Sequence, residues 1–274
     1  MAELSFKRFE KKYLLDQKQS TSVMEALLEH MQVDAYGEST ICNIYYDTPN
    51  YRLIRTSIEK PDYKEKLRLR TYGVPGAEDR AFLEIKKKCE GIVYKRRISM
   101  PYSRAMSYLE KGNAVVEAKA CQNEEKVEEL KAGLIEFGHY VNREGENSGN
   151  GRKNYVNHQI TSEIDYFLRY YGELIPACVL CYDRIALQGV EDPGIRVTID
   201  SGIRWRTDEM DLKLGDHGKQ LLEGKRLMEV KVPSHMPDWL ISILNDNQLY
   251  PTSFSKYGTV YKEGIYPGWM GKLS

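Results

Sequence analysis

The pattern of charged and apolar positions along the chain predicts a β-rich protein. In the segment KEKLRLRTYG, residues 64–73, four cations stand at every second position: Lys64, Lys66, Arg68 and Arg70. Successive side chains of a β-strand point to opposite faces, so a strand here would place all four cations on one face. Like charges this close repel one another unless water or an anionic partner compensates them.

The same alternation predicts further strands, and helical periodicity predicts helices between and after them. Strands are expected over 5–15, 40–48, the two halves of 81–100, 173–188, 194–207 and 225–233. Helices are expected over 17–32, about 115–137, the stretch that ends near 171, and 237–246, with the polar segment 143–154 as a loop. We expect one domain over residues 1–274 with a helical insertion at about 103–172, because strands resume after it.

At least eight strands with short links predict an α+β fold, namely an eight-stranded antiparallel β-barrel flanked by helices. Closure into a barrel is expected because it removes the exposed edges of a sheet. Charges spaced by two recur on most of these strands. They are Arg8, Glu10 and Lys12; Glu84, Lys86 and Lys88; Lys95 and Arg97; Arg196 and Asp200; Glu229 and Lys231, with Arg184 at the end of another apolar run.

A solvated sheet face is the simplest explanation of such a pattern on any single strand. Here the polar face is weighted to Arg and Lys on strand after strand, which favours a strand-lined concave site for a polyanion. The cations would then line the barrel interior, and helices would cover the apolar residues outside. Interior carboxylates would pair with the cations or hold a divalent metal, since Mg²⁺ and Mn²⁺ suit carboxylate plus phosphate ligands.

Composition restricts where such a site can lie. Lys+Arg and Asp+Glu both number 40 in 274 residues, so the formal net charge is zero and any basic site must be local. The neutral charge and the lack of nucleic-acid-binding motifs favour no nucleic-acid partner. Neither a signal peptide nor an integral membrane segment is recognisable, and five irregularly spaced cysteines suit a reducing compartment, so we expect a cytoplasmic protein.

Several residues allow a second interpretation. Cys178 and Cys181 form a CxxC, but they lie in an apolar run, so we interpret them as buried strand thiols rather than half of a zinc site. Trp205 and Trp239 could stack a nucleobase, but apolar packing is the simpler expectation. The five histidines are scattered, and we expect them at the surface or in packing rather than as ligands.

The motifs in their order resemble a known family, the VTC domain, which is the polyphosphate-polymerase module of the vacuolar transporter chaperone complex. More broadly they resemble the triphosphate tunnel metalloenzymes of the CYTH-like superfamily. The resemblance covers nearly the whole chain and rests on FEKKYLL, KLRLRTYG, FLEIKKK with VYKRRIS, YDRIAL with IRVTID, LMEVKV and FSKYG. It implies an antiparallel tunnel with a basic interior that holds a nucleotide triphosphate and a polyphosphate chain.

The resemblance also implies roles for individual residues. Catalytic roles are implied for Lys12, Arg68, Arg70, Lys86, Arg184, Arg196 and Glu229. Substrate-binding roles are implied for Glu10, Lys66, Lys88, Lys95, Arg97, Lys231, Ser255 and Lys256. Glu229 is implied as the carboxylate that holds Mn²⁺ or Mg²⁺.

Two departures from the wider superfamily refine this expectation. Its hydrolytic and cyclase branch opens with Glu-x-Glu-x-Lys, whereas this chain has Arg8 in place of the first Glu, which favours the polymerase branch. The inositol-phosphate-sensing and membrane domains of the eukaryotic assemblies have no counterpart here, so we expect a stand-alone, prokaryotic version.

The expected activity is transfer of the γ-phosphate of ATP to a growing inorganic polyphosphate chain. Its partners would be ATP and polyphosphate. A hydrolase of triphosphate or tripolyphosphate on the same fold is one alternative, and it would release phosphate without chain growth. A non-catalytic polyphosphate-binding module is the other, and its binding would need no metal.

Overall fold

The computed structural model describes residues 9–90, 92–120, 124–126, 128–129 and 151–267. The chain divides into two compact units. The first unit comprises Met1–Ile41, Leu180–Trp205 and His217–Ser274, and the second unit comprises Cys42–Val179 and Arg206–Asp216. Arg8, Cys121 and His139 lie outside the described residues. Within the described ranges, no helix is both long and apolar enough to cross a lipid bilayer.

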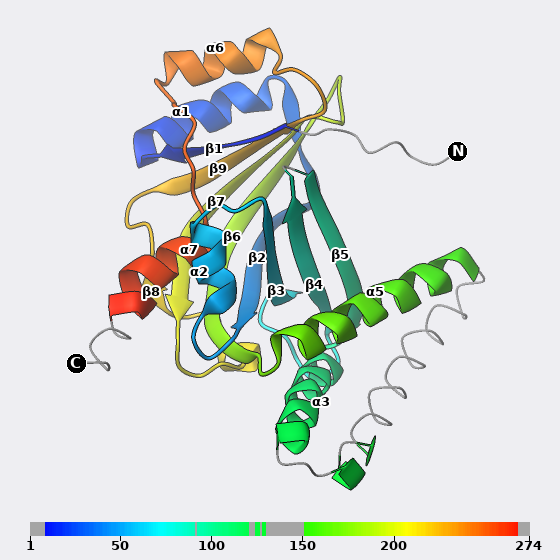
Figure 1. The fold of residues 1–274 in the computed structure, drawn as a ribbon. Coiled ribbons are helices and arrows are strands. Elements are labelled where there is room, and N and C mark those ends of the chain that lie inside the picture. Colours follow the sequence, from blue (N-terminus) through cyan, green and yellow to red (C-terminus); the bar gives the residue numbers. More distant parts are fainter. Residues whose placement is uncertain (1–8, 91, 121–123, 127, 130–150, 268–274) are drawn as a thin grey trace. The chain divides into compact units, whose positions relative to one another are not determined.

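Nine strands and several helices make up the described chain (Figure 1). The strands are β1 Phe9–Leu15, β2 Met31–Asp47, β3 Tyr63–Tyr72, β4 Arg80–Cys89, β5 Ile92–Pro101, β6 Ile175–Gly189, β7 Arg196–Arg206, β8 Lys219–Gln220 and β9 Arg226–Val232. The helices are α1 Gln17–Leu28, α2 Arg52–Ile58, α3 Tyr102–Ala120, α5 Gly151–Tyr171, α6 Asp238–Asp246 and α7 Lys256–Val260. The described residues also contain a 3₁₀ turn, Leu212–Leu214, and a π-helical turn, Tyr261–Ile265.

The strands form one sheet in the order β1-β9-β7-β6-β2-β3-β4-β5, with β8 paired to β7. The pairs β1/β9, β9/β7, β3/β4 and β4/β5 are antiparallel, which confirms the α+β prediction of an antiparallel sheet flanked by helices. The prediction of a closed barrel is wrong. The path of paired strands begins at β1 and ends at β5, and no pairing among the described residues joins these two strands. The open edges fall on strands that carry many charged side chains, which disfavour pairing with another chain.

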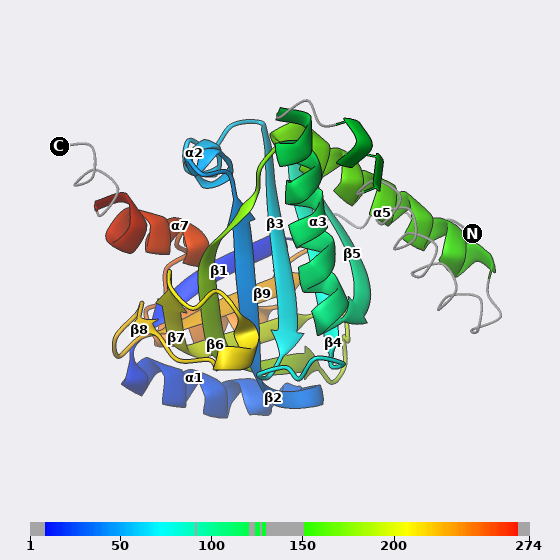
Figure 2. The same ribbon diagram turned by 90° about the horizontal axis from the view of Figure 1, so that it is seen from below.

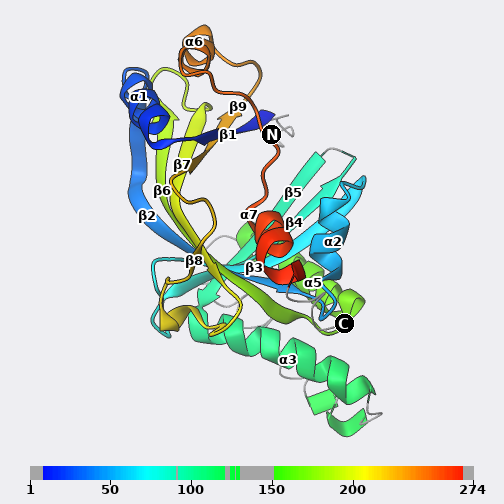
Figure 3. The ribbon, with the colours of Figure 1, turned by 90° about the vertical axis from the view of Figure 1, so that its left-hand side faces the viewer.

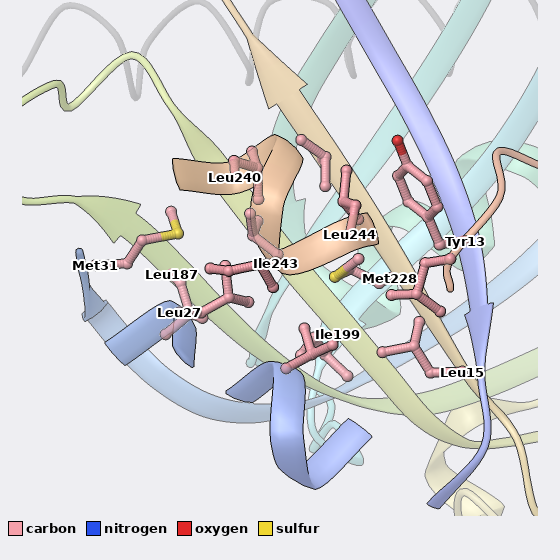
Figure 4. Packing of buried hydrophobic residues seen from close by; sticks show 14 of the residues in the cluster. Tyr13, Leu15, Leu27, Met31, Leu187, Ile199, Met228, Leu240, Ile243 and Leu244 are labelled. Atoms are coloured by element: carbon pink, nitrogen blue, oxygen red, sulfur yellow. The ribbon is translucent and has the colours of Figure 1, made fainter. Parts of the chain in front are cut away.

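In the first unit, α1 and α6 lie side by side over the apolar face of the sheet (Figure 3). The Asp16 side chain accepts the Gln19 backbone N–H at 2.7 Å, and the Gln19 side chain accepts the Asp16 N–H at 3.0 Å, which is a capping box that fixes the start of α1. Buried apolar side chains of α1, α6 and the strands form the core cluster of the first unit, and Figure 4 shows Ile243 of α6 close to Leu187 within it.

In the second unit, α3 runs along the β3–β5 strands and packs on β4 and β5, and α5 packs on β5 (Figure 2). The side chains of Leu67, Leu69, Leu83 and Ile85 are fully buried on this face. They alternate with the charged residues of β3 and β4, so the opposite face of the same strands carries the cations. The helices therefore fix which face of these strands remains for a polar ligand.

Several elements differ from the sequence prediction, and one of them is α3, which begins at Tyr102 rather than near 115. The first helix ends at Leu28 rather than at 32, because β2 begins at Met31, nine residues before the predicted strand. Helix α2 was not predicted; it begins after Asp47, which accepts the backbone N–H groups of Leu53 and Ile54 at 2.8 and 3.0 Å. The predicted loop 143–154 lies outside the described residues up to 150, and its last four residues begin α5.

Candidate functional site

A buried carboxylate surrounded by cations lies on the polar face of β3–β5 in the second unit. The Glu84 side chain is only 1% exposed. Its oxygens lie 2.7 Å from Arg68 Nε and 2.7 Å from Lys95 Nζ. Arg70 Nε and Arg97 Nη1 lie 3.9 Å away. Four cations thus share one carboxylate, and the cluster keeps a positive excess. We call it the Glu84 cluster.

The register of the strands explains why these side chains meet. Arg68 of β3 stands opposite Glu84 of β4, and Glu84 stands opposite Arg97 of β5. Arg68 also donates to the Tyr45 hydroxyl at 3.3 Å, and Arg70 Nε donates to Asn43 Oδ1 at 2.9 Å. The two guanidinium groups are therefore held in place by β2 as well as by Glu84.

Electrostatics keep Glu84 ionised despite its burial. Burial alone would raise the pKa of Glu84, but Arg68, Arg70 and Lys95 outweigh it and lower that pKa to about 2. Burial lowers the pKa of Lys95, and Arg68 and Arg70 add to this effect against the attraction of Glu84. Burial is therefore the main reason that the charged form of Lys95 is disfavoured, and the nearby arginines contribute less.

The cationic face continues along the same strands beyond the Glu84 cluster. Lys66 of β3 pairs with Lys86 of β4, and Lys86 pairs with Lys95 of β5. Lys64 pairs in turn with Lys88. Like charges directly across a sheet are destabilising, and an anion lying along them removes the repulsion. We call the cations on this face of the three strands the cation row: Lys64, Lys66, Arg68 and Arg70 of β3, Lys86 and Lys88 of β4, and Lys95 and Arg97 of β5.

A second carboxylate surrounded by cations lies in the first unit. Glu229 of β9 stands opposite Lys12 of β1, with Glu229 Oε1 3.3 Å from Lys12 Nζ. Lys231 Nζ and Lys256 Nζ lie 3.7 and 3.8 Å from the same carboxylate. Burial would raise the pKa of Glu229, but Lys256, Lys12, Lys231 and Arg184 together lower it well below its usual range. This is the Glu229 cluster.

Asp200 holds two cations of the Glu229 cluster in position. Its carboxylate is fully buried and accepts Arg184 Nε and Nη2 at 2.6 and 2.8 Å. Lys256 Nζ lies 2.5 Å from the same carboxylate, and the Tyr182 ring lies 4.5 Å from that ammonium and 5.1 Å from the Arg184 guanidinium. Burial works against the charged forms, but the pKa values of Arg184 and Lys256 are raised, with Asp200 and Tyr182 among the causes.

The remaining candidates of the first unit have more peripheral places. Glu10 Oε1 lies 3.8 Å from Lys12 Nζ, so it adjoins the Glu229 cluster. Arg196 is exposed at the start of β7, opposite Lys231. Ser255 caps α7, because its hydroxyl accepts the Gly258 N–H at 3.2 Å, and it thereby positions the start of the helix that carries Lys256.

Two carboxylates in these clusters were not predicted as site residues. Glu84 stands in the FLEIKKK motif and Asp200 in IRVTID, and both were noted only as charges spaced by two. The signal that could have found them is an acidic residue within a largely apolar strand, since such a residue must be paired when buried.

The carboxylates of the Glu229 cluster fit a metal only together with phosphate ligands. Among the described residues, no three His, Cys, Asp or Glu side chains gather as a ready metal site. Glu229 and Glu10 both contact Lys12, so ammonium groups already compensate the acidic oxygens. Mg²⁺ is commonly bound by one or two carboxylates and the phosphates of a substrate. The donor set therefore suits a cation that arrives with a phosphate chain.

Neither Trp205 nor Trp239 is placed to stack a base, and Trp269 lies outside the described residues. Trp205 packs so tightly on the backbone of Gly264 that a Cβ there would lie 2.1 Å from its ring. Trp239 stacks on His30 with ring centroids 4.5 Å apart, and it packs against the core cluster of the first unit. Cys178 and Cys181 are buried in β6, as predicted.

Two adjacent arginines of β5 provide a matched test of the cationic face. Arg97 adjoins Glu84, whereas Arg96 points to the other face and lies 3.5 Å from Glu163; their side chains are 47% and 43% exposed. We expect Arg97→Ala to weaken binding of tripolyphosphate by about tenfold, the order expected for one lost charged hydrogen bond. Arg96→Ala should leave affinity within about twofold by calorimetry. Equal losses in both variants would show that tripolyphosphate does not distinguish the two faces.

Comparison with known proteins finds similar solved structures. No curated protein matches the sequence. The chain is similar to the structure of a candidate adenylate cyclase from Vibrio parahaemolyticus, with 11% identity, 92% of this chain and 97% of that chain covered, and a TM-score of 0.42. It is also similar to the structure of a candidate adenylyl cyclase from Hippeastrum that is described as having a dominant triphosphatase activity. The identity is 14%, 94% of this chain and 96% of that chain are covered, and the TM-score is 0.45.

The family assignment rests on a different comparison. The family model of the VTC domain matches residues 7–263, which include every residue of the Glu84 and Glu229 clusters. On this match, the chain belongs to the VTC domain family.

Proposed function

We propose that the protein is a metal-dependent polyphosphate polymerase that transfers the γ-phosphate of ATP to a growing inorganic polyphosphate chain. The observation that carries the proposal is the cation row with its Glu84 cluster, where four cations surround one buried carboxylate. A repeating anion is the ligand that such a repeating row of charges suits best. Membership of the VTC domain family supports the same substrate class.

The proposed reaction asks the protein mainly to position phosphates and neutralise their charge. A terminal oxygen of the acceptor chain forms a bond to the γ-phosphorus, while the bond to the β–γ bridging oxygen breaks and ADP leaves with that electron pair. Phosphoryl transfer has a loose transition state with charge spread over the oxygens, so fixed cations stabilise it. The acceptor is itself an anionic nucleophile, so the step needs no side-chain base.

The chain's own residues divide this work in the proposal. Arg184 and Lys256, held by Asp200, bind phosphate oxygens of the reacting chain in the first unit, together with Lys12 and Arg196. Arg68, Arg70, Lys86 and Lys95 bind phosphates along the cation row. Glu229 would hold Mn²⁺ or Mg²⁺ with the phosphates, and the metal would supply further neutralisation of their charge.

The test is the product of the reaction. Purified protein is incubated with ATP and Mn²⁺, and the phosphate products are separated on a gel beside those of Arg68→Ala and Arg96→Ala. We expect a polyphosphate ladder from the wild type and from Arg96→Ala, and none from Arg68→Ala. Free phosphate without a ladder would replace the polymerase by a hydrolase. Binding of polyphosphate without turnover would leave a binding module.

A further inference from the structure

The second unit contains a tyrosine-lined pocket that lies apart from the Glu84 cluster. Its volume is about 330 Å³, within the range of pockets that hold small molecules. Helix α2, the start of β3 and the end of α5 enclose it. Arg52, Lys64 and the rings of Tyr63, Tyr166, Tyr170 and Tyr171 are among the residues that line it.

The aromatic wall of the pocket is both exposed and fixed. Tyr63, Tyr166 and Tyr170 are 48%, 60% and 56% exposed, which is unusual for rings gathered in one place. Tyr166 and Tyr170 are stacked with centroids 6.0 Å apart, and Tyr171 meets Tyr170 edge-on at 4.9 Å. The wall therefore offers ring faces to a ligand with little loss of side-chain freedom.

Buried charges hold this wall in place. The Tyr171 hydroxyl donates to Glu65 Oε2 at 2.8 Å, and Lys87 Nζ lies 3.5 Å from Glu65 Oε1. Both oxygens of Glu65 are thus engaged, and the residue supports the pocket rather than presenting a free negative charge to a ligand.

The charges at the mouth of the pocket favour an anionic ligand. The Arg52 guanidinium lies 5.8 and 5.5 Å from the rings of Tyr170 and Tyr171, and no carboxylate of the described residues pairs with it. Lys64 Nζ donates to the Ser57 carbonyl at 3.1 Å. Burial, then Lys88 and Lys60, lowers the pKa of Lys64, so an anion here would relieve a local excess of positive charge. A positively charged ligand would be repelled by both Arg52 and Lys64.

Lys64 connects the pocket to the cation row. It lines the pocket, and it also shares the cationic face of β3 with Lys66, Arg68 and Arg70. Lys64 and Arg68 are four residues apart, which is about 13 Å along a strand. Lys66 lies between them on the same face, so a phosphate chain that begins at Lys64 meets Lys66 next on its way toward Arg68.

We propose that this pocket receives the nucleobase of the nucleoside triphosphate donor, whose phosphates then run along the cation row toward Arg68. This inference rests on the proposed function, because it assigns one end of the same substrate. The base stacks on the tyrosine rings beside Arg52, and Lys64 meets the first phosphate. Stacking does not depend strongly on which base is present, because every base has a π-face, so ATP and GTP should bind with similar affinity.

Two ligands separate the base from the phosphates. Calorimetry in Mg²⁺ with the non-hydrolysable β,γ-imido analogue of ATP measures base and phosphates together, and tripolyphosphate measures phosphates alone. Tyr170→Ala should weaken the analogue by about 5- to 150-fold, the range for loss of a stacking ring, and leave tripolyphosphate within twofold. Tyr170→Phe keeps the ring and should bind both ligands like the wild type. Arg68→Ala should weaken both.

Each other outcome has a defined meaning. Unchanged affinity for the analogue in Tyr170→Ala would overturn the nucleobase pocket and leave the proposed function standing. An equal loss of both ligands in Tyr170→Ala would also overturn it, because the residue would then act on the phosphates or on the fold. If neither ligand binds the wild type, the proposed function fails and the pocket assignment fails with it.

Discussion

Glu229→Gln is expected to slow phosphoryl transfer strongly and to tighten the metal-free binding of polyphosphate. The substitution removes the carboxylate that would hold the metal, and we expect turnover to fall at least about 100-fold, the scale for loss of one electrostatic stabiliser at a reacting group. Binding should move the other way, because the ammonium groups of Lys12, Lys231 and Lys256 would lose the charge that neutralises them. Gel analysis of products and calorimetry in EDTA with tripolyphosphate measure the two effects separately.

Glu10→Gln is the matched control for this prediction. Its carboxylate also contacts Lys12, at 3.8 Å, but its side chain is 36% exposed against 11% for Glu229. We expect a loss of turnover several-fold smaller than in Glu229→Gln. A Glu229→Gln variant that makes the polyphosphate ladder at the wild-type rate would remove Glu229 from the catalytic role.

Asp200→Ala is expected to have the largest effect on stability. Asp200 is fully buried and pairs with Arg184 and Lys256, so its loss leaves Arg184 without its carboxylate and Lys256 with only the more distant Glu229, at 3.8 Å, in a buried region. Breaking a buried ion pair from one side costs about 3–5 kcal/mol. For a chain of this length, that corresponds to a fall in Tm of roughly 10 °C, measured by thermal or urea unfolding.

Asp183→Ala is the control for Asp200→Ala, because it also breaks an ion pair with an arginine but removes a less buried carboxylate. Asp183 lies 2.9 Å from Arg204 and its side chain is 33% exposed, and the Arg204 guanidinium that the substitution leaves behind still donates to the Gly202 carbonyl at 2.7 Å. We therefore expect a smaller loss than for Asp200→Ala, about 1–2 kcal/mol. Added tripolyphosphate should restore part of the stability of Asp200→Ala, because it can compensate Arg184 and Lys256. If Asp200→Ala were as stable as the wild type, the ion pairs of Asp200 with Arg184 and Lys256 would not stabilise the fold.

The sequence predicted the cationic face of β3 correctly, for a simple physical reason. Period-two alternation fixes which face of a strand each side chain occupies, and KEKLRLRTYG has no competing periodicity. The hairpin between β4 and β5 was equally clear, because the Cys-Glu-Gly turn separates two alternating runs. The roles of Lys12, Arg68, Glu229 and the other site candidates stay predictions, to be tested by the variants above.

Other features lay beyond local pattern. The first helix could not be ended correctly from periodicity, since residues 29–32 continue an amphipathic pattern although β2 begins at Met31. Helix α2 depends on Asp47, whose carboxylate accepts N–H groups six and seven residues later. The edge residues of the sheet carry no signal that distinguishes an open from a closed arrangement, so barrel closure was inferred from strand number alone.

The sequence by itself determined that this protein has charged, strand-borne faces and belongs to the VTC domain family, because alternation and ordered motifs are local properties of the chain. Only the tertiary structure decided which carboxylates the cations share. Glu84 meets Arg97 through strand register, and Asp200 meets Lys256 across 56 residues of sequence. The tyrosine pocket likewise joins Arg52, Lys64 and Tyr170, which no local pattern connects. Burial makes these pairings strong, and burial arises only when distant segments pack together.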